Sequence, residues 1–501
     1  MPLAQLFRTK SIDAIVRQDD AHGVALRKVL GPLSVVALGI GAIIGTGIFA
    51  TIGSASAGDA SRPGAGPALI VSFVVTAVVC TFTALCYAEF ASMVPVAGSA
   101  YTYAYATLGE LVAWIVGWDL LLEYAIGNTA VAIAWAGYAD AFLRGLHIDL
   151  PPWLLTDYRT AAHAKPWVLA QAPHALGVPI VFNALAVAIV AFLTILLVWG
   201  VRESARFNGA MVAVKLTILG FFVFVSTRFV APANWHPFAP NGLSGIGAGA
   251  AIIFFAYIGF DAVSTCAEEC KNPGRDMPIG ILGSLIICTC IYVIVATVFS
   301  GLIPYSQLVR LDETQRSEAL AVAMTYARMP GWMVGVVALG SVVAQTAVLL
   351  VFQLGQPRIL LAMARDGFLP PFFARVHPKH RTPHVATIAT GVLVGGVSAF
   401  ANIDEMVDLT NIGTLFAFVL VCAGTIVLRF REPLRARPFR VPFGPVIVPG
   451  LGILSCLVLI GYLPPASWTR FAVWLLVGLA FYGAYGFRRS RLRIALIDET
   501  R

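Results

Sequence analysis

Two glycines flank a threonine in the first apolar stretch of the chain, at Gly45-Thr46-Gly47. Glycine and β-branched residues both weaken a helix, so this segment favours a break in the helical hydrogen-bond ladder. A helix that restarts after such a break presents unpaired backbone N–H groups, which attract an anion such as a carboxylate. The alternative is a close-packing face of small residues against another helix. On the residues alone, the two interpretations have about equal weight.

A second segment that can unwind runs from Phe254 to Gly259, inside a later apolar stretch. Backbone carbonyls at the end of the preceding helical half would accept hydrogen bonds from an ammonium group. A site that donates at one break and accepts at the other suits a zwitterion, as an amino acid is. Taken one by one, the rings at 254, 255, 257 and 260 are better explained as core or lipid contacts.

Lys215 is the only basic residue that the sequence places well inside an apolar stretch. A lysine at mid-membrane costs at least about 2.5–3.5 kcal/mol on insertion scales, so it normally faces the protein interior and marks a pathway or relay. One interpretation, which we favour, is a lysine that exchanges a proton during a functional cycle. The other is a fixed structural cation, bonded permanently to the carbonyls of a broken helix.

Glu123 lies near the middle of the third apolar stretch, and Asp119 precedes it by one helical turn on a similar face. A buried carboxylate here can hold a cationic group or relay protons, or it can bind free N–H groups of a neighbouring helix. The two interpretations are equally supported. Four other acids fall toward helix ends, where roles in gates or loop caps are expected: Glu89, Asp261, Glu268 and Glu269.

The composition shows which kind of molecule must position these groups. Of 501 residues 58% are hydrophobic and only 12% are charged, against roughly 25% charged in an average soluble domain. The mean hydropathy is +0.83. We therefore expect an all-α polytopic membrane protein, because the apolar runs are apolar on every side and do not alternate as the strands of a β-barrel do.

Twelve stretches are long enough to be membrane helices if a span takes about 20 apolar residues. They lie near 31–54, 68–93, 108–142, 179–200, 206–227, 243–268, 278–302, 331–361, 385–402, 405–428, 446–464 and 470–487. Most of the 34 Lys and Arg residues fall on the side of the N-terminus, so both tails, 1–30 and 488–501, are expected in the cytoplasm. The basic loops on that side are expected to contact anionic lipids.

Several function classes are excluded or disfavoured by what lies between the spans. The net charge of +8 is explained by span-flanking basic residues, so no nucleic-acid partner is expected. The eight cysteines lie in or beside apolar stretches and the eight histidines in tails or loops, which indicates neither a disulfide framework nor a metal site. No phosphate-binding loop, nucleophile elbow or zinc-protease motif occurs, so we expect no enzyme, no catalytic residue and no cofactor.

The two breakable stretches, the first and the sixth, open what look like two halves of the chain. Helix-weakening segments at corresponding places in two halves are typical of inverted-repeat transporters, whose broken helices hold the substrate. The sequence therefore predicts a transport core over 31–430, with a first repeat at 31–227 and an inverted second repeat at 243–430. Two additional helices follow within 446–487.

These motifs together resemble the amino acid–polyamine–organocation superfamily, and within it the bacterial branch of the cationic amino acid transporter family. The segments that carry the resemblance are 41–49, 87–90, 95–101, 117–124, 203–208, 254–262, 268–273, 355–358, 365–367 and 381–383. The resemblance implies a LeuT-like fold of five-plus-five inverted repeats with two extra C-terminal helices. It further implies amino acid uptake by alternating access, in the inner membrane of the cell, of cationic or small neutral amino acids.

The resemblance also implies roles for individual residues. Ile44, Gly45, Thr46 and Gly47 would meet the substrate carboxylate, and Phe254, Ala256 and Ile258 its amine and side chain. Lys215 falls where proton-coupled relatives place a lysine near the first break. Glu123 matches an acidic residue of animal members, and Gln345 lies in a region that helps to set the size of the pocket in relatives.

Three hypotheses follow for the function. The first is a proton-coupled amino acid symporter in which Lys215 links protonation to gating. The second is an obligate amino acid exchanger on the same fold, with Lys215 as a fixed cation. The third and most remote is an amino acid sensor or channel that does not perform transport cycles. Whether a small accessory subunit takes part stays open.

Overall fold

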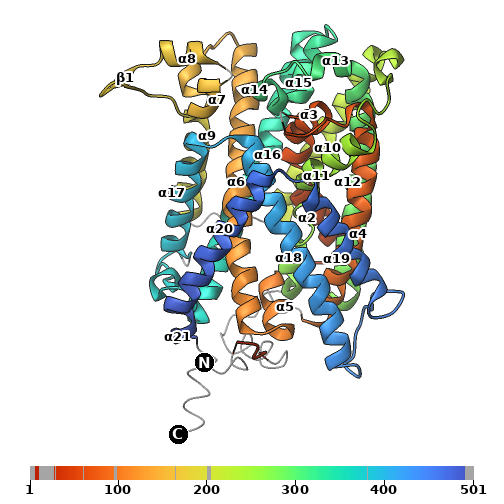
Figure 1. Ribbon diagram of the computed structural model, residues 1–501, viewed down its shortest axis with the longest axis vertical. Coiled ribbons are helices and arrows are strands. Elements are labelled where there is room, and N and C mark those ends of the chain that lie inside the picture. Colours follow the sequence, from red (N-terminus) through yellow and green to blue (C-terminus); the bar gives the residue numbers. More distant parts are fainter. Residues whose placement is uncertain are drawn as a thin grey trace.

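The protein is a bundle of long helices that run between two opposite ends (Figure 1). The computed structural model describes residues 6–10, 28, 30–59, 61–94, 99–163, 165–199, 205–380 and 382–490. Parts of the expected tails, and the motif residues 95–98, 203, 204 and 381, lie outside these described residues. The fold class expected from composition, an all-α polytopic membrane protein, is confirmed.

The first half of the chain begins with a helix in pieces and continues with long helices. Its helices are α2 (Pro32–Ile43), η2 (Gly47–Thr51), α3 (Ile52–Ala57), η3 (Gly66–Ala68), α4 (Leu69–Met93), α5 (Ser99–Thr107), α6 (Glu110–Gly145), η4 (Pro152–Leu154), α7 (Tyr158–His163), α8 (Pro166–Gln171), α9 (Ala184–Val198), α10 (Ala205–Ser226), η5 (Thr227–Phe229) and η6 (Pro232–Trp235). The two short strands β1 (His174–Ala175) and β2 (Val178–Pro179) pair antiparallel, with His174 opposite Pro179.

The second half also begins with a helix in pieces. Its helices are α11 (Gly242–Ile253), η7 (Phe254–Tyr257), η8 (Ala262–Glu269), α12 (Pro273–Leu302), α13 (Tyr305–Leu308), α14 (Glu313–Ser317), α15 (Ala319–Tyr326), α16 (Gly331–Arg365), η9 (Pro371–Ala374), α17 (His384–Phe400), α18 (Ile403–Arg431), α19 (Ile447–Gly461), α20 (Pro465–Phe481), η10 (Tyr482–Gly486) and α21 (Phe487–Arg489).

Every one of the twelve expected stretches is helical. In the part of the chain that the structure describes, eight helices are long and apolar enough to cross a membrane, and α2 with η2–α3 adds a ninth as a pair bent by 44°. The fourth, ninth and eleventh expected stretches form the shorter apolar helices α9, α17 and α19. Large apolar side chains are exposed on the outside of the bundle, for example Phe192 of α9, Phe224 of α10 and Leu476 of α20. Such exposure is expected for surfaces that face lipid.

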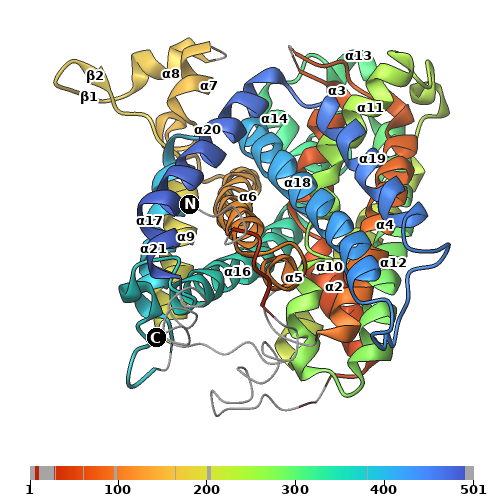
Figure 2. The same ribbon diagram turned by 60° about the horizontal axis from the view of Figure 1, so that its bottom comes forward.

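The core is built around two groups of packed helices. α6 packs along α16 and α18 (Figure 2), and α12 packs along α2 and α4. α20 lies against α6, where the indoles of Trp118 and Trp474 stack with their centroids 4.5 Å apart. Each of these two indole N–H groups donates to the backbone carbonyl of the other residue, so the pair fixes α20 on α6.

The short helices define two ends of the molecule that are used below. The α3 end carries α3, α13, α14 and α15, and the α5 end carries α5 (Figure 1). The first and last described segments meet at the α5 end, because Glu110 accepts a hydrogen bond from Ser490 and donates its N–H to the carbonyl of Arg8. These parts of the two tails therefore lie on the same side of the bundle.

Candidate functional site

The first interrupted helix breaks at the predicted glycines. α2 ends at Ile43, and Ile44 is extended, with φ −74° and ψ 107°. The first N–H donors of the next segment are those of Ile48 and Phe49, and both bonds go to the carbonyl of Gly45. The N–H groups of Gly45, Thr46 and Gly47 therefore precede the first hydrogen bond of the new helical segment, as the first N–H groups of any helix do.

The second interrupted helix changes its conformation over the predicted aromatic segment. α11 ends at Ile253, η7 is a 3-10 turn, and Ile258 is extended with ψ 136°. Gly259 has φ +119°, a conformation that glycine adopts without strain. Its N–H donates to Asp261 Oδ1 at 3.2 Å. The helical ladder is thus broken within the region that the sequence indicated.

The two breaks lie against each other. A Cβ added at Gly47 would collide with the backbone of Ala256, and one added at Gly259 would lie 2.8 Å from the carbonyl oxygen of Ala42. Both glycines are thus required by a close approach of two backbones. Segments more than 200 residues apart in the sequence therefore form one unit at the centre of the fold.

Tyr292 of α12 links the ends of the two breaks. Its hydroxyl lies 2.9 Å from the carbonyl oxygen of Ile43 and 3.0 Å from that of Ala256. A tyrosine hydroxyl has one proton, so it donates fully to only one of these two carbonyls at a time. The other carbonyl can still accept a hydrogen bond. The hydroxyl of Tyr292 can therefore turn from one carbonyl to the other when a ligand binds one of them.

Two further polar side chains from other helices support the breaks. Asn411 Nδ2 of α18 donates to the carbonyl of Ala251 at 2.8 Å and reaches that of Ile252 at 3.3 Å, which caps the end of α11. Thr46 Oγ1 donates to Gln345 Oε1 of α16 at 3.2 Å. Gln345 Nε2 is buried and has no hydrogen-bond partner, so this predicted residue holds an unused donor beside the first break.

Lys215 reaches the first interrupted helix from α10. Its Nζ donates to the carbonyl oxygen of Gly41 at 2.6 Å, and the residue is 1% exposed. Gly41 lies one turn before the break, so the ammonium group bonds α2 close to its end. This contact has the geometry expected of a cation on a broken helix, and it also places a titratable group where its protonation affects α2.

Glu123 lies beside other buried acids. It interacts electrostatically with Asp261 and with Asp119, and all three carboxylates are buried. Neither carboxylate oxygen of Asp119 has a hydrogen-bond partner. The structure therefore places Glu123 beside Asp261, which itself accepts the N–H of Gly259 at the second break. In the described part of the chain, no group of three or more His, Cys, Asp or Glu residues has an arrangement that could hold a metal ion.

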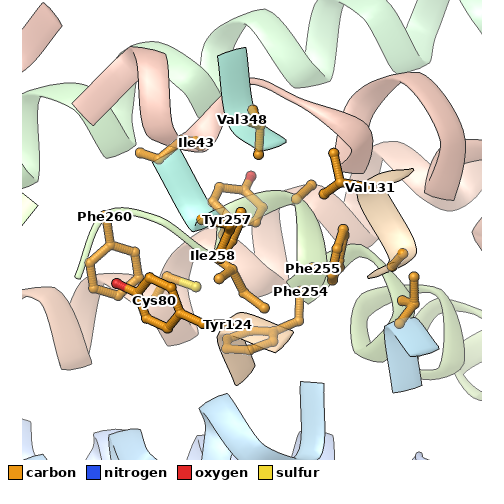
Figure 3. Close-up of a cluster of buried hydrophobic side chains, with 14 of the residues drawn as sticks. Ile43, Cys80, Tyr124, Val131, Phe254, Phe255, Tyr257, Ile258, Phe260 and Val348 are labelled. Atoms are coloured by element: carbon orange, nitrogen blue, oxygen red, sulfur yellow. The ribbon is translucent and has the colours of Figure 1, made fainter. Parts of the chain in front are cut away.

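The surroundings of the second break are apolar. Phe254, Phe255 and Ile258 gather with Tyr124, Val131 and Val348 in one cluster of side chains (Figure 3). Phe254 also packs edge-to-face on Phe418 at 5.6 Å between ring centroids. All ten residues for which a role in substrate binding or proton coupling was predicted are buried. This conformation is therefore closed around the two breaks.

Ionic contacts close the α3 end of the bundle. Arg62, 7% exposed, bonds both carboxylate oxygens of Asp408 on α18, at 2.8 and 2.9 Å, and also pairs with Asp59. Burial raises the pKa of Asp59, but Arg62 and Ser61 together hold it below its ordinary value. Ser54 of α3 donates to Asp404 at 2.8 Å. The piece after the first break is thereby fastened to α18.

Similar contacts close the α5 end. Lys10 pairs with Asp366 at 3.5 Å, and Tyr101 of α5 donates to the same carboxylate at 2.7 Å. Glu89 of α4 is buried and accepts from Arg429 of α18, and its Oε2 also accepts from the N–H of Val441 at 2.7 Å. Glu89 thus joins α4 to α18 and to the backbone of Val441.

Sequence reasoning missed Tyr292, Asn411 and the partners of Arg62. Tyr292 is one of 14 tyrosines and sits in a helix without any irregular motif, so nothing in its local sequence sets it apart. Asn411 does carry a signal, because a polar amide in an apolar membrane stretch needs a partner within the protein.

Comparison with known proteins agrees with this geometry. The family model described as Amino acid permease matches residues 30–481. The chain belongs to the amino acid permease family. The resemblance to the amino acid–polyamine–organocation superfamily is thereby confirmed, and this permease takes part in amino acid transport.

Curated relatives match this permease over most of its length. The branched-chain amino acid permease BcaP of Bacillus subtilis (strain 168) is 44% identical over 97% of this chain and 99% of its own. The methylthioribose transporter of the same bacterium is 38% identical over 98% of this chain and 100% of its own. The vacuolar cationic amino acid transporter 4 of Arabidopsis thaliana is 37% identical over 85% of this chain and 68% of its own. The names of these relatives are those of transporters.

Proposed function

We propose that this permease takes up amino acids by alternating access and is driven by protons. The substrate carboxylate binds the N–H groups of Gly45, Thr46 and Gly47, and the substrate amine binds carbonyls of the segment from Phe254 to Ile258. The observation that carries this proposal is the direct contact of the two broken helices, with Tyr292 donating across them. One break supplies donors and the other acceptors, as a zwitterion requires.

We propose an amino acid with a branched apolar side chain as the substrate. The side chains that gather around the second break are aromatic or aliphatic (Figure 3). Glu123, the acid that could attract a cationic side chain, lies with Asp119 and Asp261 instead. The printed name of the relative BcaP, a branched-chain amino acid permease, supports the same choice. In this proposal Glu123 acts on protons or on helix position rather than on the substrate.

We propose that Lys215 couples proton movement to the opening of α2. A charged ammonium makes a stronger hydrogen bond to the carbonyl of Gly41 than a neutral amine does, so protonation favours the closed arrangement. Loss of the proton weakens the attachment and allows α2 to move away from α10. The positions of the two breaks, at the start of each half, support inverted repeats at 31–227 and 243–430, with α19 and α20 outside the core. We place the protein in the inner membrane with both tails in the cytoplasm.

The 2.6 Å bond from Lys215 to Gly41 also favours a second candidate, an obligate exchanger with Lys215 as a fixed cation. Reconstituted liposomes separate the two. A symporter accumulates labelled leucine in empty vesicles when the outside is acidic, and a protonophore abolishes the accumulation. An exchanger takes up label only into vesicles preloaded with amino acid and ignores the pH gradient. A sensor takes up none.

The role of Lys215 is tested with Lys215→Gln, which keeps a donor near Gly41 but cannot titrate. We expect gradient-driven accumulation to fall at least tenfold while exchange in preloaded vesicles continues. Thr217→Val, on an exposed face of the same helix, is the control and should behave as wild type. Gradient-driven uptake that survives Lys215→Gln contradicts the coupling role, and competition by unlabelled leucine, lysine and alanine tests the substrate class separately.

A further inference from the structure

A groove runs along the membrane-facing side of α10 and α12. It has a volume of about 700 Å³, within the range of small-molecule binding sites. Its floor includes the buried side chains of Leu219 and Val295, and its rim includes Phe224 and Ile294, which are exposed. Gly220 opens into it, because a Cβ added there would meet no atom within 4 Å. The groove is apolar except at one end.

The length of the groove matches one leaflet of a bilayer. On α10 and η5 it extends from Leu216 to Arg228, which at 1.5 Å per residue is about 18 Å. Half of a hydrocarbon core of about 30 Å is about 15 Å. A transmembrane helix of a partner protein would need a seam along the whole span, so a lipid chain that ends at mid-membrane fits this groove better.

The polar end of the groove carries an uncompensated positive charge. Arg228 lies at the α3 end and is exposed, and none of the ion pairs found among the described residues involves it. Trp332, 62% exposed, packs on Phe221 of α10 near the same end. Tryptophan and arginine at such a position are typical of the headgroup region, where arginine binds phosphate with its guanidinium fork.

We propose that this groove binds one anionic phospholipid. The headgroup phosphate lies at Arg228, and an acyl chain lies along Phe224, Gly220 and Leu216 toward the middle of the membrane. The site is separate from the two broken helices, and it does not depend on which substrate is carried or on proton coupling.

The groove lies directly behind two residues of the candidate site. Leu216 follows Lys215 on α10, and Ile291 precedes Tyr292 on α12. Lys215 and Tyr292 face the interrupted helix α2, whereas their neighbours face the groove. A bound lipid therefore restrains the relative position of α10 and α12, which hold the end of α2 from two sides. Occupancy is expected to change the transport rate without any contact with substrate.

The test measures lipid binding to the intact protein. Purified protein is equilibrated with equal amounts of phosphatidylglycerol and phosphatidylcholine in detergent, and bound lipid is counted by native mass spectrometry. Wild type should retain one phosphatidylglycerol about tenfold over phosphatidylcholine, because both lipids offer the phosphate but only the choline group carries a positive charge that Arg228 repels. Arg228→Gln should lose this preference and keep weak binding of either lipid. Gly220→Phe, which fills the groove, should lose the retained lipid altogether.

Matched controls show whether these effects are local. Gly396→Phe places a ring into the similar apolar groove between α9 and α17, and Arg310→Gln removes another exposed arginine of the α3 end. Both should retain phosphatidylglycerol as wild type does. Equal retention of the two lipids by wild type overturns the proposal, as does undiminished retention by both Gly220→Phe and Arg228→Gln. A co-purified single-helix polypeptide that Gly220→Phe displaces also overturns it, since the occupant would then be a protein.

Discussion

The contacts that define the candidate site are mostly made by backbone atoms. Gly47 and Ala256 touch without side chains between them, and the groups they leave free are N–H and C=O groups. Backbone groups bind the part that all amino acids share, the carboxylate and the amine. In the proposed function, the surrounding side chains, such as Phe254 and Ile258, then select among substrate side chains.

Gly47→Ala is expected to reduce uptake at least tenfold while the protein still inserts into the membrane. The added methyl group would collide with the backbone of Ala256, which cannot rotate away as a side chain does. Uptake per amount of membrane-extracted protein measures the effect. Gly335→Ala, with no atom within 4 Å of the added Cβ, is the control. Normal uptake by Gly47→Ala would show that the two breaks do not need this close approach.

Tyr292→Phe is expected to raise KM for the substrate about tenfold and to lower stability by about 1 kcal/mol. The variant removes the hydroxyl that donates to Ile43 and Ala256 but keeps the ring. Tyr482→Phe is the matched control, because its buried hydroxyl donates to Glu110 at 2.9 Å at the α5 end, away from both breaks. Its stability should fall by a similar amount with little change in KM. Equal KM values for the two variants would remove the special role of Tyr292.

The sequence indicated the residues whose type is unusual for their surroundings. Glycines around Thr46 and a lysine in an apolar stretch are such residues, and the structure puts them at the first break. Tyr292 and Asn411 act through partners hundreds of residues away or on other helices, and only the packing of those helices brings the atoms together. Glu123 shows the same limit, because its neighbour Asp261 is 138 positions away in the sequence.

At the scale of helices, the two ends of the bundle are closed by different means. Arg62 ties the segment after α3 to α18, whereas Glu89 ties α4 to α18 at the α5 end. α18 is thus fastened at both ends. The alternating access that we propose requires that one fastening opens while the other stays closed, so each buried ion pair is a point where the proposed cycle can be arrested.

Arg62→Ala is expected to destabilise the protein by about 3–5 kcal/mol, because it leaves Asp408 and Asp59 without their cation. Arg62→Lys should restore only part of the loss, since an ammonium cannot bond both oxygens of Asp408 as the guanidinium does. Thermal unfolding in detergent measures both. Arg159→Ala breaks a pair with Glu405 in which the arginine side chain is 59% exposed, and it should cost less than about 1 kcal/mol.

The helices themselves could be predicted almost completely, and their ends less well. Apolar runs give the position of a span because the bilayer imposes length and composition. The same rule overestimates the lengths of α9, α17 and α19, which have 15, 17 and 15 residues. Their flanking residues belong to loops, and composition cannot distinguish a loop residue from the end of a helix.

At the scale of the whole molecule, connections outside the membrane also carry buried charge. Glu318 lies between α14 and α15 and accepts from Arg144 of α6 at 2.9 Å. Burial raises the pKa of Glu318 to about 7, although the Arg144 guanidinium opposes the rise. The connection between α12 and α16 thus docks on the end of α6 through a carboxylate that changes its charge near neutral pH.

Glu318→Gln is expected to flatten the pH dependence of stability. The pKa of Glu318 in the folded protein lies above the ordinary value of 4.5, so the unfolded chain loses its proton first as the pH rises. Wild type should therefore lose stability between about pH 5 and pH 7, by up to about 3 kcal/mol. Thermal unfolding across this range measures the slope. Glu432→Gln, at an exposed carboxylate, should follow wild type, and parallel curves for all three proteins would contradict the assignment.

The stacked indoles of Trp118 and Trp474 supply an internal optical label. Two indoles stacked 4.5 Å apart couple their electronic transitions, so the pair should produce a circular-dichroism band in the near ultraviolet that separated rings lack. The band would weaken if α20 left α6, because only the stack of Trp114 on Trp118 within α6, at 5.5 Å, would remain. It would stay unchanged if the two helices moved as one body. Unlabelled protein in a cuvette can therefore report whether the last long helix travels with α6 during turnover.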